Sequence, residues 1–233
     1  MPRRPRSAQG GVAFHAINRG NCRMTIFEKE GDYLAFMQLL EEGRRRVDMR
    51  ILAWCLMPNH WHLVLYPRRA QDLSDFFRWV CTTHVRRWRM HRHNSGEGHL
   101  YQGRFKSFPI QRDEHLLRVM RYVEANPLRA GRVKRAQDWP FSSLWAGPRP
   151  PECQVQLDRQ AMVHPADWVA QVNRSLGLEE LKRLRLSVNR GRPYGGARWV
   201  QAAAARLGLG STLRGPGRPR KQAIRGGKGA GSV

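Results

Sequence analysis

The chain has 233 residues, and 41% of them are hydrophobic, which is enough to bury one sizeable core and excludes a chain that is disordered throughout. Its 42 lysines and arginines outnumber 18 aspartates and glutamates, and the formal charge of +24 is hard to explain without a polyanionic partner. We therefore expect a nucleic acid partner. No apolar run is long enough to cross a membrane, and the four cysteines form no Cys-x-x-Cys pair. The composition predicts a cytoplasmic protein with reduced thiols, no membrane association and no small-molecule cofactor.

The predicted elements alternate between strand and helix through the first 126 residues. Their ranges, in chain order, are a strand at 12–18, a helix at 32–46, strands at 50–57 and 60–66, a helix at 74–92, a strand at 105–111 and a helix at 113–126. Pro58 and Asn59 separate the second and third strands, which is typical of a hairpin. This order predicts an α+β protein with a ferredoxin-like split βαβ fold, an antiparallel sheet with helices on one face.

The composition changes after residue 147. Three prolines between residues 148 and 151 indicate a linker, and weaker helical patterns follow near 165–174, 178–188 and 196–207. The last residues are rich in glycine and cations and hold no acid. The predicted domain division is a basic N-terminal arm at 1–11, a catalytic domain at 12–147, a small helical C-terminal extension at 148–210 and a disordered basic tail at 211–233.

Two histidines in the third predicted strand are candidate metal ligands. Side chains of a strand alternate between its faces, so His60 and His62 point to one side and Trp61 to the other. Such pairs are more often packing or surface residues than ligands, and the surrounding residues decide between these interpretations. On the helix at 113–126, Tyr122 lies about 120° from Leu116 by helical spacing, away from the middle of the apolar stripe. An ordinary tyrosine at the edge of a core would have the same pattern.

A tyrosine and a metal site together suggest phosphoryl chemistry. A phenol is almost fully protonated at neutral pH, so its attack on phosphorus needs assistance. A hard divalent cation, Mg²⁺ or Mn²⁺, would assist by neutralising charge on a phosphate oxygen. Asn126, one helical turn beyond Tyr122, could complete the protein ligands with its amide oxygen. Exchange of one phosphodiester for a phosphotyrosine ester would need no ATP.

Four sequence blocks resemble the single-tyrosine HUH transposases, and most closely their branch of REP-associated tyrosine transposases. The blocks are 14–21 (FHAINRGN), 57–65 (MPNHWHLVL), 101–108 (YQGRFKSF) and 121–130 (RYVEANPLRA). The resemblance implies a ferredoxin-like domain in which His60 and His62 bind the metal, Tyr122 forms a 5′-phosphotyrosine and Asn126 is the third ligand. Relatives often carry glutamine at that last position. It also implies single-stranded DNA with hairpin-forming palindromes as the substrate, in the nucleoid of a bacterium, and either a monomer or a homodimer.

Candidate DNA contacts are cations and one aromatic residue in or near these blocks, because single strands are held by charge and by stacking. They are Arg19, Arg104, Phe105, Lys106 and Arg118. The segments 191–193 and 217–220 each resemble the Gly-Arg-Pro core of AT-hooks, which makes Arg192, Arg218 and Arg220 further candidates. An unstructured electrostatic tether would explain these two segments equally well.

Two alternatives stay open at this stage. The chain could be a hairpin-binding protein that kept the fold and lost cleavage, acting structurally or as a regulator. It could also be a zinc hydrolase, although no acidic residue accompanies the histidine pair in a metal motif. The presence of every expected site residue favours a metal-dependent DNA strand transferase.

Overall fold

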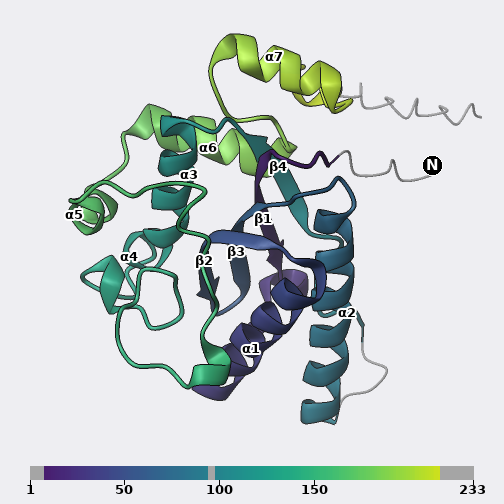
Figure 1. The fold of residues 1–233 in the computed structure, drawn as a ribbon. Helices are drawn as coiled ribbons and strands as arrows, with labels where there is room; N and C mark the ends of the chain where they lie inside the picture. Colours follow the sequence, from purple (N-terminus) through teal and green to yellow (C-terminus); the bar gives the residue numbers. More distant parts are fainter. Residues whose placement is uncertain (1–7, 94–97, 216–233) are drawn as a thin grey trace, which may run out of the picture.

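The computed structural model describes residues 8–93 and 98–215, arranged around one four-stranded sheet (Figure 1). The strands are β1 (Ala13–Arg19), β2 (Arg50–Met57), β3 (His60–Tyr66) and β4 (Lys106–Ile110). The α-helices are α1 (Glu30–Val47), α2 (Asp72–Arg92), α3 (Glu114–Glu124), α4 (Asn126–Arg129), α5 (Trp168–Asn173), α6 (Leu178–Arg190) and α7 (Ala197–Arg206). The sheet order is β2-β3-β1-β4, and each neighbouring pair is antiparallel. This arrangement confirms the predicted ferredoxin-like α+β fold.

One face of the sheet carries α1 and α2. Trp61, Leu63 and Leu65 of β3 point to this face and are fully buried in a core that these two helices complete. The ring of Trp61 stacks on Phe77 of α2 with centroids 5.2 Å apart, and its indole N–H donates to the hydroxyl of Tyr101. This core fixes the strand that carries the histidine pair.

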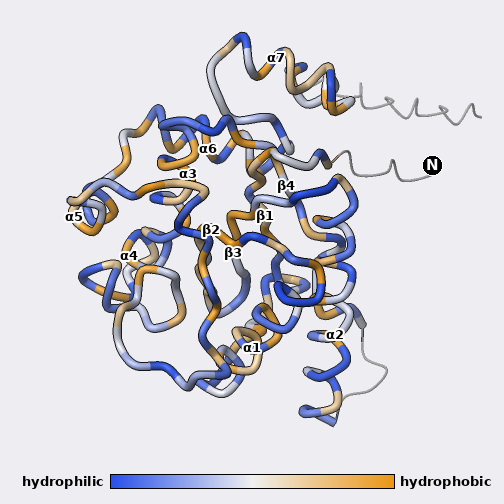
Figure 2. The backbone as a smooth tube through the Cα atoms, viewed as in Figure 1, coloured by the Kyte–Doolittle hydropathy of each residue, from blue (hydrophilic) through white to orange (hydrophobic). Residues whose placement is uncertain are grey.

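The other face is covered by α3 together with α5 and α6, which corrects the expectation that the helices lie on one face. Leu116, Val119 and Val123 of α3 are fully buried with Val64 and Phe108 of the sheet in a second core. The physical reason lies in the strands, because β2 and β3 carry buried side chains on both faces and both faces need a cover. Figure 2 shows this concentration of hydrophobic segments at the central strands.

Two segments beyond α4, only one of them in the C-terminal extension, protect the edges of the sheet. Residues 141–143 run along β2, where Leu56 N–H donates to Phe141 O and Ser143 N–H donates to Trp54 O. At the other edge, Tyr194 exchanges two backbone hydrogen bonds with the segment at β4 and bridges Ile110 in parallel. Paired edges cannot recruit a foreign strand, so these two segments together complete the sheet.

The predicted linker is part of the folded structure. Cys153 and Val155 are buried in the core beside α1, because apolar side chains follow the prolines of this stretch. The predicted arm and tail fall largely on residues 1–7 and 216–233, which lie outside the described residues. All four cysteines are free thiols, as expected. Across residues 8–93 and 98–215, no helix has the length and apolar character needed to span a membrane.

Candidate active site

The histidine pair lies on the sheet face that α3 covers. His60 is directly opposite Arg19 of β1, and His62 is opposite Ile17, so these four side chains share one face of the sheet. The rings of His60 and His62 are 5.0 Å apart between centroids. Strand alternation therefore places the two imidazoles side by side, with Trp61 in the opposite core.

Each imidazole of the pair has a partner on one ring nitrogen. His62 Nδ1 lies 2.8 Å from Nε2 of His15, and His60 Nδ1 lies 2.6 Å from Oδ1 of Asn59. These bonds involve the Nδ1 atoms and leave the two Nε2 atoms as the nitrogens that can bind a metal. Sequence reasoning did not identify His15, although its place two residues before Ile17 puts it on the same face of β1.

Burial keeps these histidines neutral. Burial, with smaller contributions from the positive charges of Arg19 and Arg129, lowers the pKa of His60 to about 3. Burial also lowers the pKa of His62 well below its usual value, with the neighbouring His60 and His15 adding to the effect. Neutral imidazoles carry the free lone pair that metal binding requires.

Tyr122 on α3 lies directly over this group. Its ring centroid is 5.9 Å from that of His62 and 6.4 Å from that of His15, with the rings nearly perpendicular in both cases. Tyr122 is 7% exposed and belongs to the second core, although its helical position, away from the middle of the apolar stripe, predicted that it is not chiefly a core residue. The second layer of helices buries a position that the helical pattern alone places at the edge.

Arg129 and Asn126 complete the surroundings of the tyrosine. The guanidinium carbon of Arg129 lies 4.2 Å from the centre of the Tyr122 ring, and Arg129 also donates to the Tyr122 carbonyl. Asn126 donates from Nδ2 to the carbonyl of Tyr122 at 3.1 Å, and its Oδ1 accepts from Arg129 at 2.5 Å. The amide oxygen predicted as a metal ligand is therefore engaged by a guanidinium here.

Arg129 was absent from the predicted site. Its position in the block at 121–130 was visible in the sequence, but the turn into α4 that brings it back over Tyr122 was not. A cation on the face of a phenol ring favours negative charge on that ring. Arg129 therefore has the chemistry to stabilise a phenolate at Tyr122.

Three predicted cations lie at one side of this site. Gln102 N–H donates to Arg19 O, and Asn18 Nδ2 donates to Gly103 O, which ties the loop after Tyr101 to the end of β1. Arg19, Arg104 and Lys106 line a hollow of about 160 Å³ at this place. The structure thus brings together the cations of two separate sequence blocks.

Other predicted DNA contacts occupy different surroundings. Phe105 is 6% exposed and packs on Phe77 with centroids 4.1 Å apart, so its ring is core and is not open for base stacking. Arg118 forms an ion pair with Glu180 of α6 at 3.5 Å. Arg192 follows the left-handed cap Gly191 and precedes a buried proline, so segment 191–193 is a folded turn and not a free AT-hook. Arg218 and Arg220 lie outside the described residues.

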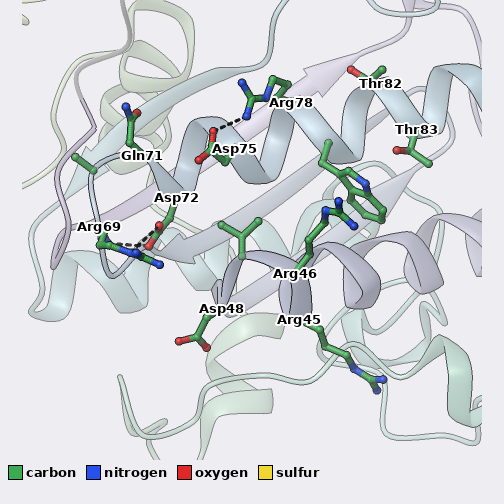
Figure 3. Close-up of a pocket in the computed structure, with 13 residues that line it drawn as sticks. Arg45, Arg46, Asp48, Arg69, Gln71, Asp72, Asp75, Arg78, Thr82 and Thr83 are labelled. Atoms are coloured by element: carbon green, nitrogen blue, oxygen red, sulfur yellow. Dashed lines mark hydrogen bonds and ion pairs between the residues drawn. The ribbon is translucent and has the colours of Figure 1, made fainter.

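In two further surface features, most of the charged side chains are paired within the protein. Asp113, Glu114 and His115 have ligand atoms within 4.8 Å of one another, but Asp113 accepts from the N–H of His115 as the cap of α3. The hollow of about 900 Å³ in Figure 3 lies between the end of α1 and the start of α2. Of its cations, Arg69 and Arg78 pair with aspartates and Arg45 pairs with Glu41, so most of its positive charge is balanced; Arg46 lies over the ring of Trp79.

The fold and the paired His-Trp-His strand beneath a helical tyrosine define the class of protein, a transposase that cleaves and joins DNA. The chain belongs to the family of IS200-like transposases, which matches residues 8–126.

Named relatives agree with this assignment. The REP-associated tyrosine transposase of Escherichia coli is 25% identical over 165 residues, covering 70% of this chain and 88% of the relative. A solved structure of a REP-associated tyrosine transposase bound to a REP hairpin is 26% identical, with a TM-score of 0.48, and covers 61% of this chain and 81% of that one. The predicted resemblance to REP-associated tyrosine transposases is confirmed.

Proposed function

We propose that this transposase cleaves and rejoins single-stranded DNA beside a palindromic hairpin, with Tyr122 as the nucleophile. The position of the Tyr122 ring 5.9 Å from His62, on the sheet face shared with His60, is the observation that carries the proposal. Its relatives are named for REP sequences, and one of them is bound to a REP hairpin, which supports a hairpin of this kind as the substrate.

The residues of the site divide the chemistry among them. The oxygen of Tyr122 attacks the phosphorus of a phosphodiester, the bond to the 3′ oxygen breaks, and the DNA 5′ phosphate becomes an ester of the tyrosine. The phenol gives up its proton and the leaving 3′ oxygen takes one up. Arg129 over the ring stabilises the phenolate, and Arg19 beside His60 holds the phosphate by charge. Attack by a 3′ hydroxyl reverses the steps and rejoins the strand.

The residues of the site fit a divalent cation, and we propose Mg²⁺ or Mn²⁺. Two neutral imidazoles lie on one face, and their Nδ1 atoms are already occupied by His15 and Asn59. His60 and His62 would therefore hold the ion through Nε2. Ligation by Asn126 requires Arg129 to give up its hydrogen bond to Oδ1. When bound, the cation supplies charge neutralisation at the phosphate oxygen.

A cleavage assay on hairpin-bearing single-stranded DNA tests this function. With Mg²⁺ or Mn²⁺, wild type should form a covalent protein-DNA adduct, and Tyr122→Phe should form none while binding the hairpin equally well. Equal cleavage by both proteins would remove Tyr122 from the mechanism. Hairpin binding without any adduct from wild type would instead identify a non-catalytic binder. Hydrolysis that depends on zinc and not on DNA would support a hydrolase.

His60, His62 and Tyr122 meet within one chain, so the proposal is compatible with a monomer as well as a homodimer. Its substrate would place the enzyme on chromosomal DNA, in the bacterial cytoplasm. Sedimentation with and without hairpin DNA would measure which oligomer is active.

A further inference from the structure

Helix α6 lies beside the candidate active site, although it belongs to the extension beyond the matched family region. Leu184 and Ser187 are buried against the fold, and Arg118 of α3 pairs with Glu180 at the start of α6. At its end, Gly191 takes a left-handed conformation with φ of 70° and approaches the carbonyl of Ser107. The helix is therefore fixed at both ends, against α3 and against β4.

One flank of α6 faces the cations near His60. Val188 and Asn189 line the same hollow of about 160 Å³ as Arg19, Arg104 and Lys106. Arg185 lies one turn before Asn189 and thus on the same flank, and after burial its charge is a smaller cause of the lowered pKa of Arg129. The extension therefore contributes a polar side chain to the opening beside Arg19.

The charge at this opening is unbalanced. Within the described part of the chain, no carboxylate pairs with Arg19, Arg104, Lys106 or Arg185, and Nε of Arg19 is buried without a hydrogen-bond partner. In the hollow of Figure 3, by contrast, Arg69 and Arg78 each have an aspartate. Arg19, Arg104 and Lys106 line one hollow without acids, and with Arg185 on the adjoining flank of α6 they need an external anion to offset their repulsion.

We propose that α6 forms one wall of a path for single-stranded DNA, in which Arg185 contacts a phosphate and Asn189 contacts the strand that continues from the scissile phosphate. The opposite wall is the loop that carries Arg104 together with Lys106 at the start of β4. A surface lined by cations can hold the phosphates of a single strand, and the amide of Asn189 can donate to and accept from a base edge. The direction of the strand in this inference rests on the proposed function, whereas the position of the strand rests on the charge pattern.

Binding of labelled oligothymidine to the full chain, without divalent cation, tests this wall separately from hairpin recognition. Arg185→Gln should weaken the affinity about fivefold and make the slope of log K against log salt less negative by about 0.7, the value for one phosphate contact on a single strand. Asn189→Ala should weaken binding without changing the slope. Thermal unfolding of each variant checks that it remains folded.

Arg183→Gln is the matched control. Arg183 lies about 200° from Arg185 around the same helix, where it faces Tyr194, so its loss removes the same charge from the other flank. This control should leave the salt slope close to that of wild type. Equal effects of the two substitutions would overturn the proposal, because they would show a general charge effect.

Cleavage of a hairpin with single-stranded flanks gives a second readout. Arg185→Gln should raise KM with little change in kcat, since α6 is proposed to bind the strand and not the reacting atoms. A faster reaction in this variant would contradict the proposal, because it would show that α6 obstructs the site. If Arg185→Gln weakens oligothymidine binding but wild type forms no adduct, the wall is supported and only the proposed function is refuted.

Discussion

Replacement of His15 by phenylalanine tests how the histidine pair is organised. For His62 to bind a metal through Nε2, its Nδ1 must carry the proton and donate it to Nε2 of His15 at 2.8 Å. His15 is fully buried, and no water can substitute for it as the acceptor. His15→Phe would therefore leave a buried donor without a partner.

The expected loss follows from that single bond. A buried donor left unpaired costs about 1–3 kcal/mol, and loss of a partner that orients a metal-bound histidine typically lowers affinity about 10- to 100-fold. We expect Mn²⁺ affinity to fall in this range for His15→Phe. His15→Gln, whose amide oxygen can accept the same proton, should stay closer to wild type.

Electron paramagnetic resonance of free Mn²⁺ during a titration measures these affinities without requiring catalysis. Circular dichroism and thermal unfolding should first show that both variants fold, since Phe108 packs on the ring at this position with centroids 4.9 Å apart. A folded His15→Phe protein that binds Mn²⁺ as tightly as wild type would refute the role of His15.

Three further predictions concern charge and protonation. Arg129→Gln should slow adduct formation about tenfold at saturating cation, because it removes the cation over the Tyr122 ring, and an unchanged rate would contradict this role. Burial lowers the pKa of His84 to about 3, so below pH 6.5 the unfolded chain binds more protons than the folded chain. This group should therefore lower the free energy of unfolding by about 2 kcal/mol by pH 5, which denaturant titration at each pH measures. His84→Phe should show a smaller fall. Burial raises the pKa of Glu124 to about 7, so the folded state binds more protons between pH 4.5 and 7 and loses stability as pH rises. Glu124→Gln should therefore raise the Tm at pH 8 and raise it much less at pH 5. A lower Tm of this variant at pH 8 would refute the prediction.

The sequence predicted the sheet and the shared face of the histidine pair because both depend on local patterns. Alternation in the strand at 60–66 placed His60 and His62 together and Trp61 in the core, and the order of elements predicted the topology that the structure has. Helix bounds agree closely as well, for example in α2, where the predicted 74–92 compares with Asp72–Arg92.

The missing parts depend on contacts between distant segments. The bond between His15 and His62 joins two strands, and Arg129 reaches Tyr122 through a turn that no periodicity marks. Phe105 was assigned to DNA because aromatic residues stack on bases, but the opposite helix supplies Phe77 for it to pack on. The position of α6 could not be predicted, since a helix with an ordinary apolar stripe does not specify its docking site.

The identity of the residue that becomes linked to DNA tests the central claim most directly. Tryptic digestion of the covalent adduct, followed by mass spectrometry, should find the nucleotide on the peptide from residues 122–129, attached to Tyr122 through a 5′ phosphate. Attachment to another residue, such as Tyr101 or Tyr194, would contradict the account.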